Sequence, residues 1–306
     1  MIRRTSVTTT INDALELFIS EKRAKNLADR TVEGYEFQVK QFLKDCDLSI
    51  DDEVSCIDKA IILNYTNYLL SKNISHESVN NYLRSIRVFV NWLCANDYIS
   101  RVKVNMVKGQ EERLKFYTEE EIEKLVKKPS NKCSFVEHRT WAVICFILAT
   151  GARISTVINI KREDLNLNEH YVIYRHLKNK STQMIPLSTS ITKILSEYLR
   201  TWSIDGDYIF CDIHGNKATV AAIRGALNNY CTKRDVTPKG IHALRHSFAR
   251  EWCKHNGNSY QLQRMLTHKS TEMVKRYVNL FAEDIQIEEY APLEFFVKSN
   301  KKVKRA

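Results

Sequence analysis

Two short segments combine side chains that suit phosphoryl transfer. In IHALRHSFAR (residues 241–250), His242 and Arg245 are three residues apart, so on a helix they share one face. There, a neutral imidazole could take the proton of an attacking hydroxyl while the guanidinium binds an anionic phosphate. In TGARIS (residues 150–155), Arg153 follows an apolar stretch and offers a second planar cation. Two such cations could hold the charge that develops on non-bridging oxygens, although a surface ion pair is the usual role of an arginine.

A third segment, THKSTEMVKRYV (residues 267–278), offers a nucleophile in Tyr277. A phenol, whose ordinary pKa is about 10, is a poor nucleophile at neutral pH unless neighbouring groups activate it. The two arginines and His242 could provide that activation. Any single one of the 14 tyrosines is most often a packing or surface residue, so only its segment distinguishes this one. His246, one position after the second arginine, is expected to point elsewhere around its helix as a structural residue.

The charge distribution favours a polyanionic partner. The chain of 306 residues has a net charge of +11 and a pI near 9.2. Residues 1–100 carry 12 Lys and Arg against 14 Asp and Glu, so the rest of the chain carries 35 against 22. Phosphate binding is therefore expected in the second part, with nucleic acid as the favoured partner and a merely basic surface as the alternative. No apolar run reaches the roughly 20 residues that cross a bilayer, so no membrane partner is expected.

The eight cysteines are spread singly and none forms a CxxC pair. Zinc sites and disulfide frameworks need closer spacing, so neither is predicted. Buried, reduced thiols in a cytoplasmic protein are the simpler interpretation. The N-terminal stretch has a basic pair but no long apolar core, which argues against a secretory signal.

The first 100 residues are predicted to form a helical domain. Thr10 is expected to cap a first helix, a second begins near Asp29, DKAIILNYTNYLL forms a third, and Ser75 caps a fourth. The polar side chains of the fourth helix could face DNA, with a solvated helix face as an equally good interpretation. These candidates are Asn80, Asn81, Arg84 and Arg87.

Residues 101–115 lack amphipathic periodicity and are interpreted as a linker between domains. Three lysines of this segment could meet backbone phosphates if the linker follows DNA: Lys103, Lys108 and Lys115. Thr118 then caps a new helix, with Glu121 three residues later as in a capping box. The second domain is accordingly expected over residues 116–290, followed by a basic tail at 291–306.

Within the second domain, HRTWAVICFILAT is predicted to form a buried helix that ends at Gly151 in a left-handed conformation. HYVIYR and TQMIPL are short and rich in β-branched or aromatic residues, with a polar turn between them, which predicts a β-hairpin. The chain from residue 190 onward is predicted to be helical. The expected fold is mostly α, with a helical first domain and an α+β second domain that holds a small antiparallel sheet.

Taken together, TGARIS, IHALRHSFAR and THKSTEMVKRYV resemble the conserved boxes of the tyrosine recombinase, or phage integrase, family in order and separation. The likeness covers nearly the whole chain, because residues 9–100 resemble that family's helical, SAM-like core-binding domain. A lone HxxR pair occurs often by chance, whereas three boxes with a correctly placed hairpin lysine are specific. The resemblance implies a two-domain recombinase, in which a core-binding domain precedes an α+β catalytic domain.

The resemblance also implies covalent catalysis on DNA, without a metal or another cofactor. A tyrosine attacks a phosphate, forms a 3′-phosphotyrosyl link and frees a 5′ hydroxyl; a hydroxyl of a partner duplex then attacks the link, by way of a Holliday junction. The implied catalytic residues are Arg153, Lys178, His242, Arg245, His268 and Tyr277. The implied partners are double-stranded DNA with inverted-repeat core sites and, on two such sites, a tetramer of the chain itself.

Three positions carry specific expectations from this resemblance. The hairpin lysine, Lys178 with Lys180 as its rival, would protonate the departing 5′ oxygen, and His268 would hydrogen-bond a non-bridging oxygen. Thr156 stands where the family commonly has an acidic residue, so the local hydrogen-bond network is expected to differ. The apolar stretch LFAEDIQIEEYAPLEFF, after Tyr277, is expected to dock on a neighbouring subunit, with packing in its own subunit as the alternative.

Two other functions remain open. One is a non-cleaving DNA-binding regulator of the same fold, which the full set of implied catalytic residues disfavours. The other is a type IB topoisomerase-like nicking-closing enzyme, which the separate helical front domain disfavours. The target DNA sequence, and the choice between integration or excision, resolution and inversion, do not follow from the sequence.

Overall fold

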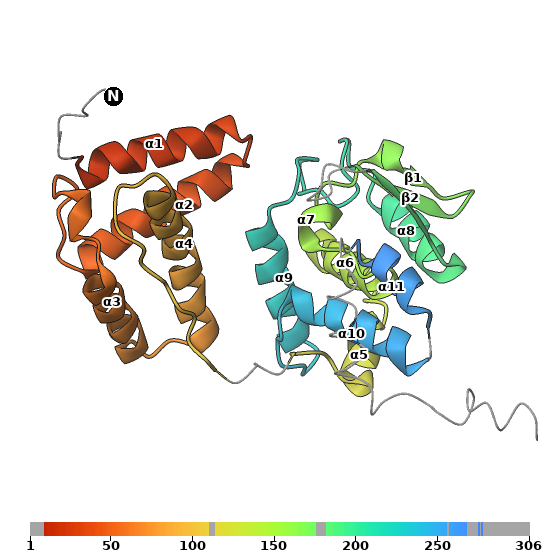
Figure 1. Ribbon diagram of the computed structural model, residues 1–306. Helices are drawn as coiled ribbons and strands as arrows, with labels where there is room; N and C mark the ends of the chain where they lie inside the picture. The colour runs from red at the N-terminus through yellow and green to blue at the C-terminus, as the bar shows by residue number, and fades with distance from the viewer. Residues whose placement is uncertain are drawn as a thin grey trace, which may run out of the picture. The chain divides into compact units, whose positions relative to one another are not determined.

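The computed structural model describes residues 9–109, 114–175, 182–255 and 257–267, together with residues 275 and 277. The chain divides by its internal contacts into two units, Met1–Glu112 and Arg113–Ala306. Figure 1 draws the first unit in red to gold and the second in yellow to blue. Over the described residues, no helix combines the length and the apolar character that a membrane crossing requires.

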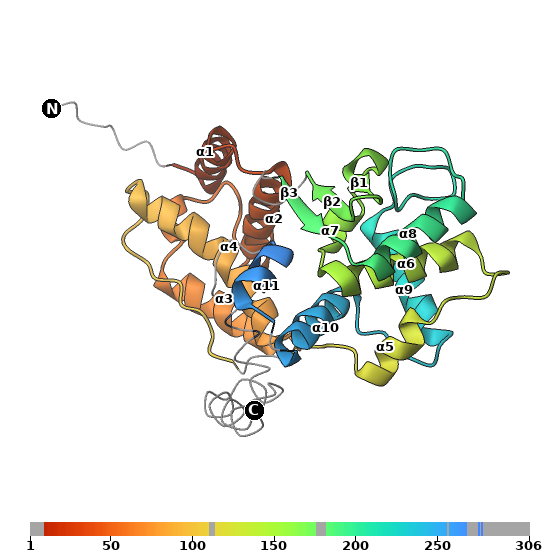
Figure 2. The ribbon, with the colours of Figure 1, turned by 90° about the vertical axis from the view of Figure 1, so that its right-hand side faces the viewer.

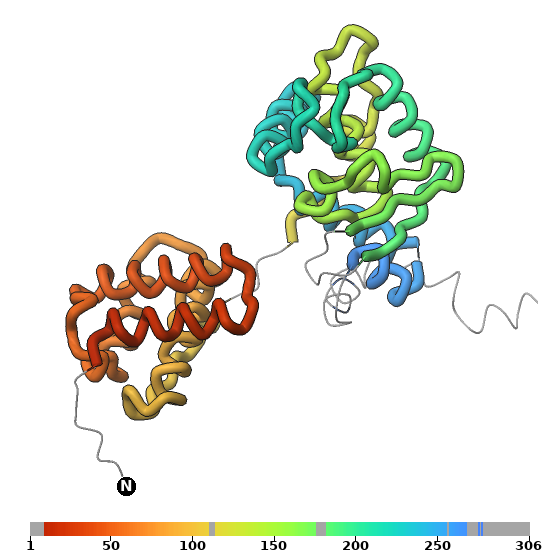
Figure 3. The backbone as a smooth tube through the Cα atoms, turned by 90° about the horizontal axis from the view of Figure 1, so that it is seen from above, coloured from red at the N-terminus to blue at the C-terminus, as the bar shows by residue number. Residues whose placement is uncertain are grey.

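Over residues 9–109, the first unit consists of four α-helices and a short 3₁₀ turn (Val54–Cys56), whose backbone can be followed in Figure 3. The helices are α1 (Ile11–Ala24), α2 (Asp29–Asp45), α3 (Lys59–Ser71) and α4 (His76–Ala95). Thr10 caps α1 in a capping box, and the side chains of Asp58 and Ser75 accept backbone hydrogen bonds at the starts of α3 and α4. The caps predicted at Thr10 and Ser75 are therefore confirmed.

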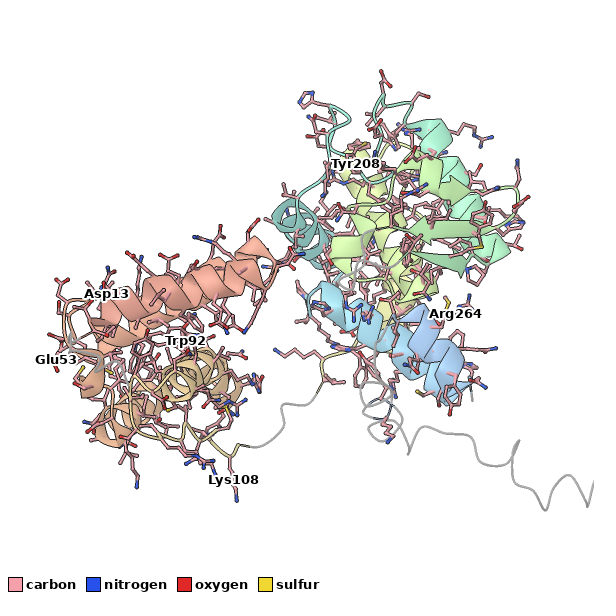
Figure 4. All side chains as sticks on the ribbon, turned by 45° about the horizontal axis from the view of Figure 1, so that its top comes forward. Asp13, Glu53, Trp92, Lys108, Tyr208 and Arg264 are labelled. Carbon is pink, nitrogen blue, oxygen red and sulfur yellow. The ribbon has the colours of Figure 1, made fainter. Side chains whose placement is uncertain are left out.

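The apolar faces of these helices meet in one core. Phe18 of α1 lies edge-to-face with Phe89 of α4, with ring centroids 5.2 Å apart, and Phe42 of α2 packs similarly on Tyr65 of α3 at 4.9 Å. Trp92, labelled in Figure 4, also lies against Phe18. Burial of each large apolar side chain contributes about 1.5–3 kcal/mol. The shared aromatic core therefore explains why these helices form one unit.

The segment after α4 belongs in part to this first unit. Val104 is buried in the core, and Met106 and Val107 pack against it. Asn80 of α4 fastens the stretch, because its Nδ2 donates to the Val107 carbonyl at 2.9 Å and its Oδ1 accepts from the Val107 N–H at 2.8 Å. The chain up to Val107 is thus fixed to the first unit, inside the range 101–115 that the sequence suggested for a linker.

In the second unit, α6 (Phe135–Thr150) is apolar on nearly all sides and packs against several other helices, as Figure 2 shows. Its partners are α5 (Glu119–Val126), α8 (Thr189–Thr201), α9 (Val220–Thr232) and α10 (Ile241–Lys254). The short α7 (Ile154–Val157) follows α6, and α11 (Ser259–Met265) packs on α10. Thr118 and Glu121 form the predicted capping box at the start of α5.

A three-stranded antiparallel sheet accompanies these helices, in the order β1 (Leu165–Asn166), β2 (Tyr171–Tyr174) and β3 (Gln183–Pro186). Val172 of β2 pairs with Leu165 on one side and with Ile185 on the other. The predicted hairpin and the mostly helical fold with a small antiparallel sheet are confirmed. Strand β1 was not predicted, because two residues carry no recognisable alternation. The hairpin turn, with Lys178 and Lys180, lies outside the described residues.

The prediction of helix throughout the chain after residue 190 was wrong for residues 202–219. They form an irregular loop between α8 and α9, fastened by isolated β-bridges that pair Lys161 with Tyr208 and Cys211 with Lys217. The loop contains SIDGDY and DIHGNK, whose Asp, Asn and Gly residues are typical of turns. These local signals outweigh the helical character of the flanking segments.

The eight cysteines are free thiols, and the expectation that they are buried holds for half of them. The buried ones are Cys145, Cys211, Cys231 and Cys253, and the half-buried ones are Cys46, Cys56, Cys94 and Cys133. Burial raises the pKa of the Cys145 thiol to about 12, so this thiol stays protonated at neutral pH.

Candidate active site

A tight turn at the end of α6 sets the position of Arg153. Gly151 ends the helix with φ 64° and ψ 17°, a left-handed conformation, and its N–H donates to the Ile147 carbonyl at 2.7 Å. A Cβ at this position would lie 2.5 Å from Cδ1 of Phe248 in α10, so the turn needs glycine for its conformation and for this contact. Arg153 follows at the start of α7, with its side chain half-buried.

Arg245 of α10 joins the end of α6 to the end of α11, and it is 4% exposed. Its Nη1 donates to the Gly151 carbonyl at 2.6 Å, and its Nη2 donates to the Leu266 carbonyl at 2.8 Å. Burial and then the charge of Arg153 lower the pKa of Arg245 to about 10, whereas Tyr277 opposes this decrease by its charge and a side-chain hydrogen bond. The guanidinium therefore remains charged at neutral pH.

Arg153 reaches the same turn after α11. Its Nη1 donates to Oγ1 of Thr267 at 2.7 Å and lies 3.4 Å from the carbonyl oxygens of Leu266 and Thr267. Burial lowers the pKa of Arg153, and Tyr277 again opposes the decrease. Thr267 has a φ of 52°, a conformation that a β-branched residue rarely adopts. Two cations thus meet at a strained turn, and such strain is often found at functional sites.

The sheet supports this turn. Gln183 of β3 donates from its Nε2 to the carbonyl of Arg264, near the end of α11 (Figure 4 labels Arg264), at 2.7 Å. This contact brings the β2–β3 hairpin close to the carbonyls that bind both arginines. Lys178 belongs to the turn of that hairpin and His268 follows Thr267 in the chain, but both lie outside the described residues.

Tyr277 packs on α10 with 5% of its surface exposed, in an apolar cluster that includes Phe248 and Leu262. Its hydroxyl oxygen is 2.9 Å from Nδ1 of His246, and the two ring centroids are 5.7 Å apart. The prediction that His246 points away from the site was therefore wrong. Successive residues of a helix differ by only about 100° in direction, so Arg245 and His246 can both reach a phenol that lies between them.

His242 is the exposed member of this group. Desolvation and then the charges of Arg245, Arg153 and Arg224 lower its pKa, so the neutral imidazole is favoured. Arg224 was not a candidate from the sequence, because a single arginine in VAAIRGALNNYC belongs to no motif. It adds a third cation, from the exposed face of α9, to the surroundings of His242.

Thr156, which replaces the expected acidic residue, is buried in α7. Its N–H donates to the Arg153 carbonyl at 2.8 Å, so it supports the turn through its backbone. The two arginine side chains are held by the carbonyls after α6 and α11 and by the Thr267 hydroxyl. Oriented by neutral groups, the guanidiniums suit an anionic ligand such as a phosphate.

Of the polar residues on α4 that were expected to face DNA, Asn80 has a contact within the fold. Both ends of its amide bind Val107, a contact across 27 positions that helix periodicity cannot reveal. Arg84 pairs with Glu77 at 2.8 Å and donates to Asn81. The remaining basic candidates all have exposed side chains: Arg87, Lys103, Lys108 and Lys115.

A groove of about 580 Å³ lies between α2 and α4 of the first unit. Its lining includes Arg84 and Asn81 from α4 together with Arg30, Tyr35 and Gln38 from α2. Arginine, asparagine and glutamine side chains are common donors to phosphate and sugar groups of DNA. The α2 residues were not predicted as DNA contacts from the sequence, because their place in the groove depends on which face of α2 packs towards α4.

Both units match models of known protein families. The phage integrase family matches residues 115–284, and the N-terminal SAM-like domain of phage integrases matches residues 15–100. Tyrosine recombinase XerC of Staphylococcus aureus is 24% identical over 277 residues, which cover 87% of this chain and 91% of XerC.

Two solved structures share the fold. A lambda integrase tetramer bound to a Holliday junction aligns over 89% of this chain and 78% of its own, with a TM-score of 0.73 and 16% identity. The XerH site-specific recombinase, in a post-cleavage complex with palindromic difH substrate, aligns over 92% of this chain and 84% of its own, with a TM-score of 0.70 and 19% identity.

Proposed function

Since this chain belongs to the phage integrase family, we propose that it is a tyrosine site-specific recombinase that cuts and rejoins DNA strands. One observation carries this proposal. The Tyr277 hydroxyl lies beside His246 and is hydrogen-bonded to Arg245, and Arg153 binds the same turn as Arg245. A phenol next to two cations is the arrangement that a tyrosine nucleophile for a phosphate diester requires.

In the proposed reaction, Arg153 and Arg245 hold the non-bridging oxygens of the scissile phosphate. Their buried or half-buried guanidiniums act in a region of low dielectric, where they stabilise developing charge more strongly than in water. The Tyr277 oxygen attacks phosphorus and forms a 3′-phosphotyrosyl bond, while the 5′ oxygen departs. His242, neutral and exposed, contacts the phosphate or transfers a proton.

Lys178 is proposed as the acid that protonates the departing 5′ oxygen, with Lys180 as its rival, and His268 as a further phosphate contact. The hydrogen bond from Gln183 to the Arg264 carbonyl supports the first assignment, because it holds β3 near the turn that both arginines bind. Thr267, the neighbour of His268 in the chain, is itself bound by Arg153, which supports the second assignment.

The proposed partners are double-stranded DNA with inverted-repeat core sites and a tetramer of the chain on two such sites. The lambda integrase tetramer on a Holliday junction, which shares the fold, supports this assembly. Arg87, Lys103, Lys108 and Lys115 are proposed to meet backbone phosphates. Each neutralised phosphate releases counterions, so the affinity for DNA is expected to fall steeply with salt.

Covalent capture tests the proposal. Fragmented DNA of the organism that encodes the chain is incubated with the protein and denatured in SDS, and the DNA that remains attached is sequenced, with Tyr277→Phe in parallel. We expect adducts at a few inverted-repeat sites for the wild-type chain and none for the variant. DNA binding under native conditions without any adduct would replace the recombinase by a non-cleaving regulator.

The same samples address a nicking-closing enzyme. Adducts spread over many unrelated sequences, together with relaxation of an unrelated supercoiled plasmid, would favour a type IB topoisomerase-like activity. Adducts confined to repeats, without relaxation of that plasmid, are the result that the recombinase predicts.

A further inference from the structure

The hydrogen bond between His246 and Tyr277 is not among the contacts that the proposed reaction uses. His246 comes directly after Arg245 on α10 and is half-buried, and its Nδ1 is 2.9 Å from the hydroxyl that would attack DNA. His242, the histidine that the resemblance selects, is on the same helix but has an exposed side chain. Two histidines of α10, His242 and His246, are therefore candidates to take the proton of Tyr277.

The hydrogen-bond donors and acceptors around the phenol indicate which histidine can accept its proton. A guanidinium can only donate, so in its hydrogen bond with Arg245 the phenol oxygen is the acceptor. With its oxygen accepting from Arg245, the phenol can donate its proton to Nδ1 of His246, the ring nitrogen 2.9 Å away. This arrangement requires a neutral imidazole whose own proton is on Nε2. The phenol thus accepts from a cation on one side and donates to a base on the other, which is how a nucleophile is activated.

The cations of the site act on His242 and on the Tyr277 phenol. Arg245, Arg153 and Arg224 all act on His242, which makes it a poor proton acceptor but a suitable neutral donor to a phosphate oxygen. Arg245 and His246 of α10 contact the Tyr277 phenol, and Arg153 of the turn before α7 interacts with it electrostatically. The cations stabilise the phenolate form of Tyr277, and Nδ1 of His246 lies within hydrogen-bond distance of the phenol oxygen.

We propose that His246 is the general base for Tyr277, and that His242 is left to contact the phosphate. This assignment rests on the proposed recombinase function. In cleavage, the Tyr277 O–H bond breaks and its proton bonds to Nδ1 of His246. The phenolate oxygen bonds to phosphorus, the bond from phosphorus to the 5′ oxygen breaks, and that oxygen takes a proton from Lys178. In rejoining, each step reverses, so the imidazolium returns its proton to the departing phenol.

The protonation of the ring is testable without DNA. The full chain is labelled with ¹⁵N-histidine, and the His246 signals are assigned by their loss in His246→Gln. Long-range ¹H–¹⁵N spectra at neutral pH are expected to show Nε2 protonated and Nδ1 unprotonated, with the Nδ1 signal shifted in Tyr277→Phe. A proton on Nδ1, or a signal that Tyr277→Phe leaves unchanged, would overturn the proposal, whatever activity the chain has.

Adduct formation then separates the two histidines. DNA sites recovered by covalent capture are cleaved by wild-type chain, His246→Gln and His242→Gln over a range of pH, after thermal unfolding has established that each variant folds. Glutamine can hydrogen-bond the phenol but cannot take its proton. His246→Gln is therefore expected to slow adduct formation by at least about 100-fold and to remove the decline in rate on the acid side of neutrality.

The matched variant, His242→Gln, is expected to be slower than wild type but to keep that acid-side decline. A His246→Gln rate equal to wild type, or a decline that disappears in His242→Gln instead, would overturn the assignment. If the wild-type chain forms no adduct on any DNA, the recombinase function itself fails, while the NMR result still shows whether His246 accepts the phenol proton.

Discussion

The two units of the chain differ in the burial and the hydrogen-bond partners of their candidate polar side chains. In the second unit, Arg245 is 4% exposed and donates to two backbone carbonyls, and Tyr277 is 5% exposed beside it. In the first unit, Arg87 on α4 is exposed, while Asn80 on the same helix is committed to Val107. Buried polar groups need partners of defined geometry, which the second unit supplies to Arg245, whereas Arg87 lies on the surface of the first unit.

The largest expected effect comes from a buried cation of the candidate active site. Lysine cannot donate to the carbonyls of Gly151 and Leu266 in the geometry of Arg245, so Arg245→Lys is expected to lower the rate of adduct formation by about 10²–10³-fold. The measurement is the rate of adduct accumulation on a captured DNA site, by gel electrophoresis in SDS.

Arg139→Lys is the matched control. Arg139 is also 4% exposed and donates to a carbonyl, that of Cys211 at 2.7 Å, but it lies near the other end of α6, roughly 18 Å along the helix from Gly151. The Arg139→Lys variant is expected to be less stable, without a comparable decrease in the rate of adduct formation. Equal losses of adduct in both variants would mean that buried arginines act here only through the fold.

The turn that orients Arg153 can be broken by one methyl group. Gly151→Ala places a Cβ in a left-handed conformation and 2.5 Å from Phe248, which is expected to cost about 2–4 kcal/mol in the free energy of unfolding. Gly225→Ala in α9 is the control, because its Cβ meets nothing within 4 Å, and it is expected to stabilise the helix by about 0.5–1 kcal/mol. Denaturant unfolding compares the two, and equal stabilities would contradict the strained-turn description.

Two substitutions in the first unit are expected to have smaller effects, one on stability and the other on DNA binding. Asn80→Ala is expected to cost about 1–3 kcal/mol, because it leaves the Val107 N–H and carbonyl without their partner, and to speed amide exchange near that residue. Arg87→Ala is expected to change stability by less than about 0.5 kcal/mol but to reduce the salt slope of DNA binding by about 1. Salt titrations of binding are the measurement, and a slope that changes only in Asn80→Ala would reverse the assignments.

The smallest expected effect is a pH dependence confined to the second unit. Burial lowers the pKa of His138, an effect that Glu197 opposes, so the folded chain holds this imidazole neutral more firmly than the unfolded chain does. The unfolded state then binds more protons as the pH falls through about 6.5, and the stability that depends on neutral His138 is lost in that range. In the first unit the single histidine, His76, is exposed.

Calorimetry of the full chain between neutral and mildly acidic pH measures this effect. The transition that belongs to the second unit is expected to move to lower temperature as the pH falls, and to move less in His138→Gln. An unchanged pH dependence in that variant would show that other groups are responsible.

Local signals explain what could be predicted from the sequence. The caps at Thr10, Ser75 and Thr118 and the left-handed end of α6 at Gly151 depend on residues within one helical turn, and all four are confirmed. The hairpin is likewise local, because β2 and β3 pair across one short connection. Hydrophobic periodicity and capping chemistry are sufficient for features of this kind.

The remaining features depend on contacts between distant positions. Asn80 meets Val107 across 27 residues and His246 meets Tyr277 across 31, and neither pair has a spacing that helix geometry relates. Arg224 approaches His242 because α9 and α10 both pack on α6. The residue types of the candidate site could thus be predicted from its sequence segments, whereas the contact between His246 and Tyr277 required the tertiary structure.

Covalent attachment of Tyr277 to DNA is the defining step of the proposed reaction. Adducts from covalent capture are digested with nuclease and protease, and the peptide that carries the nucleotide remnant is sequenced by tandem mass spectrometry. We expect a remnant joined through its 3′ phosphate to Tyr277, and no remnant in Tyr277→Phe. A remnant on any other residue, or one that persists in Tyr277→Phe, would contradict it.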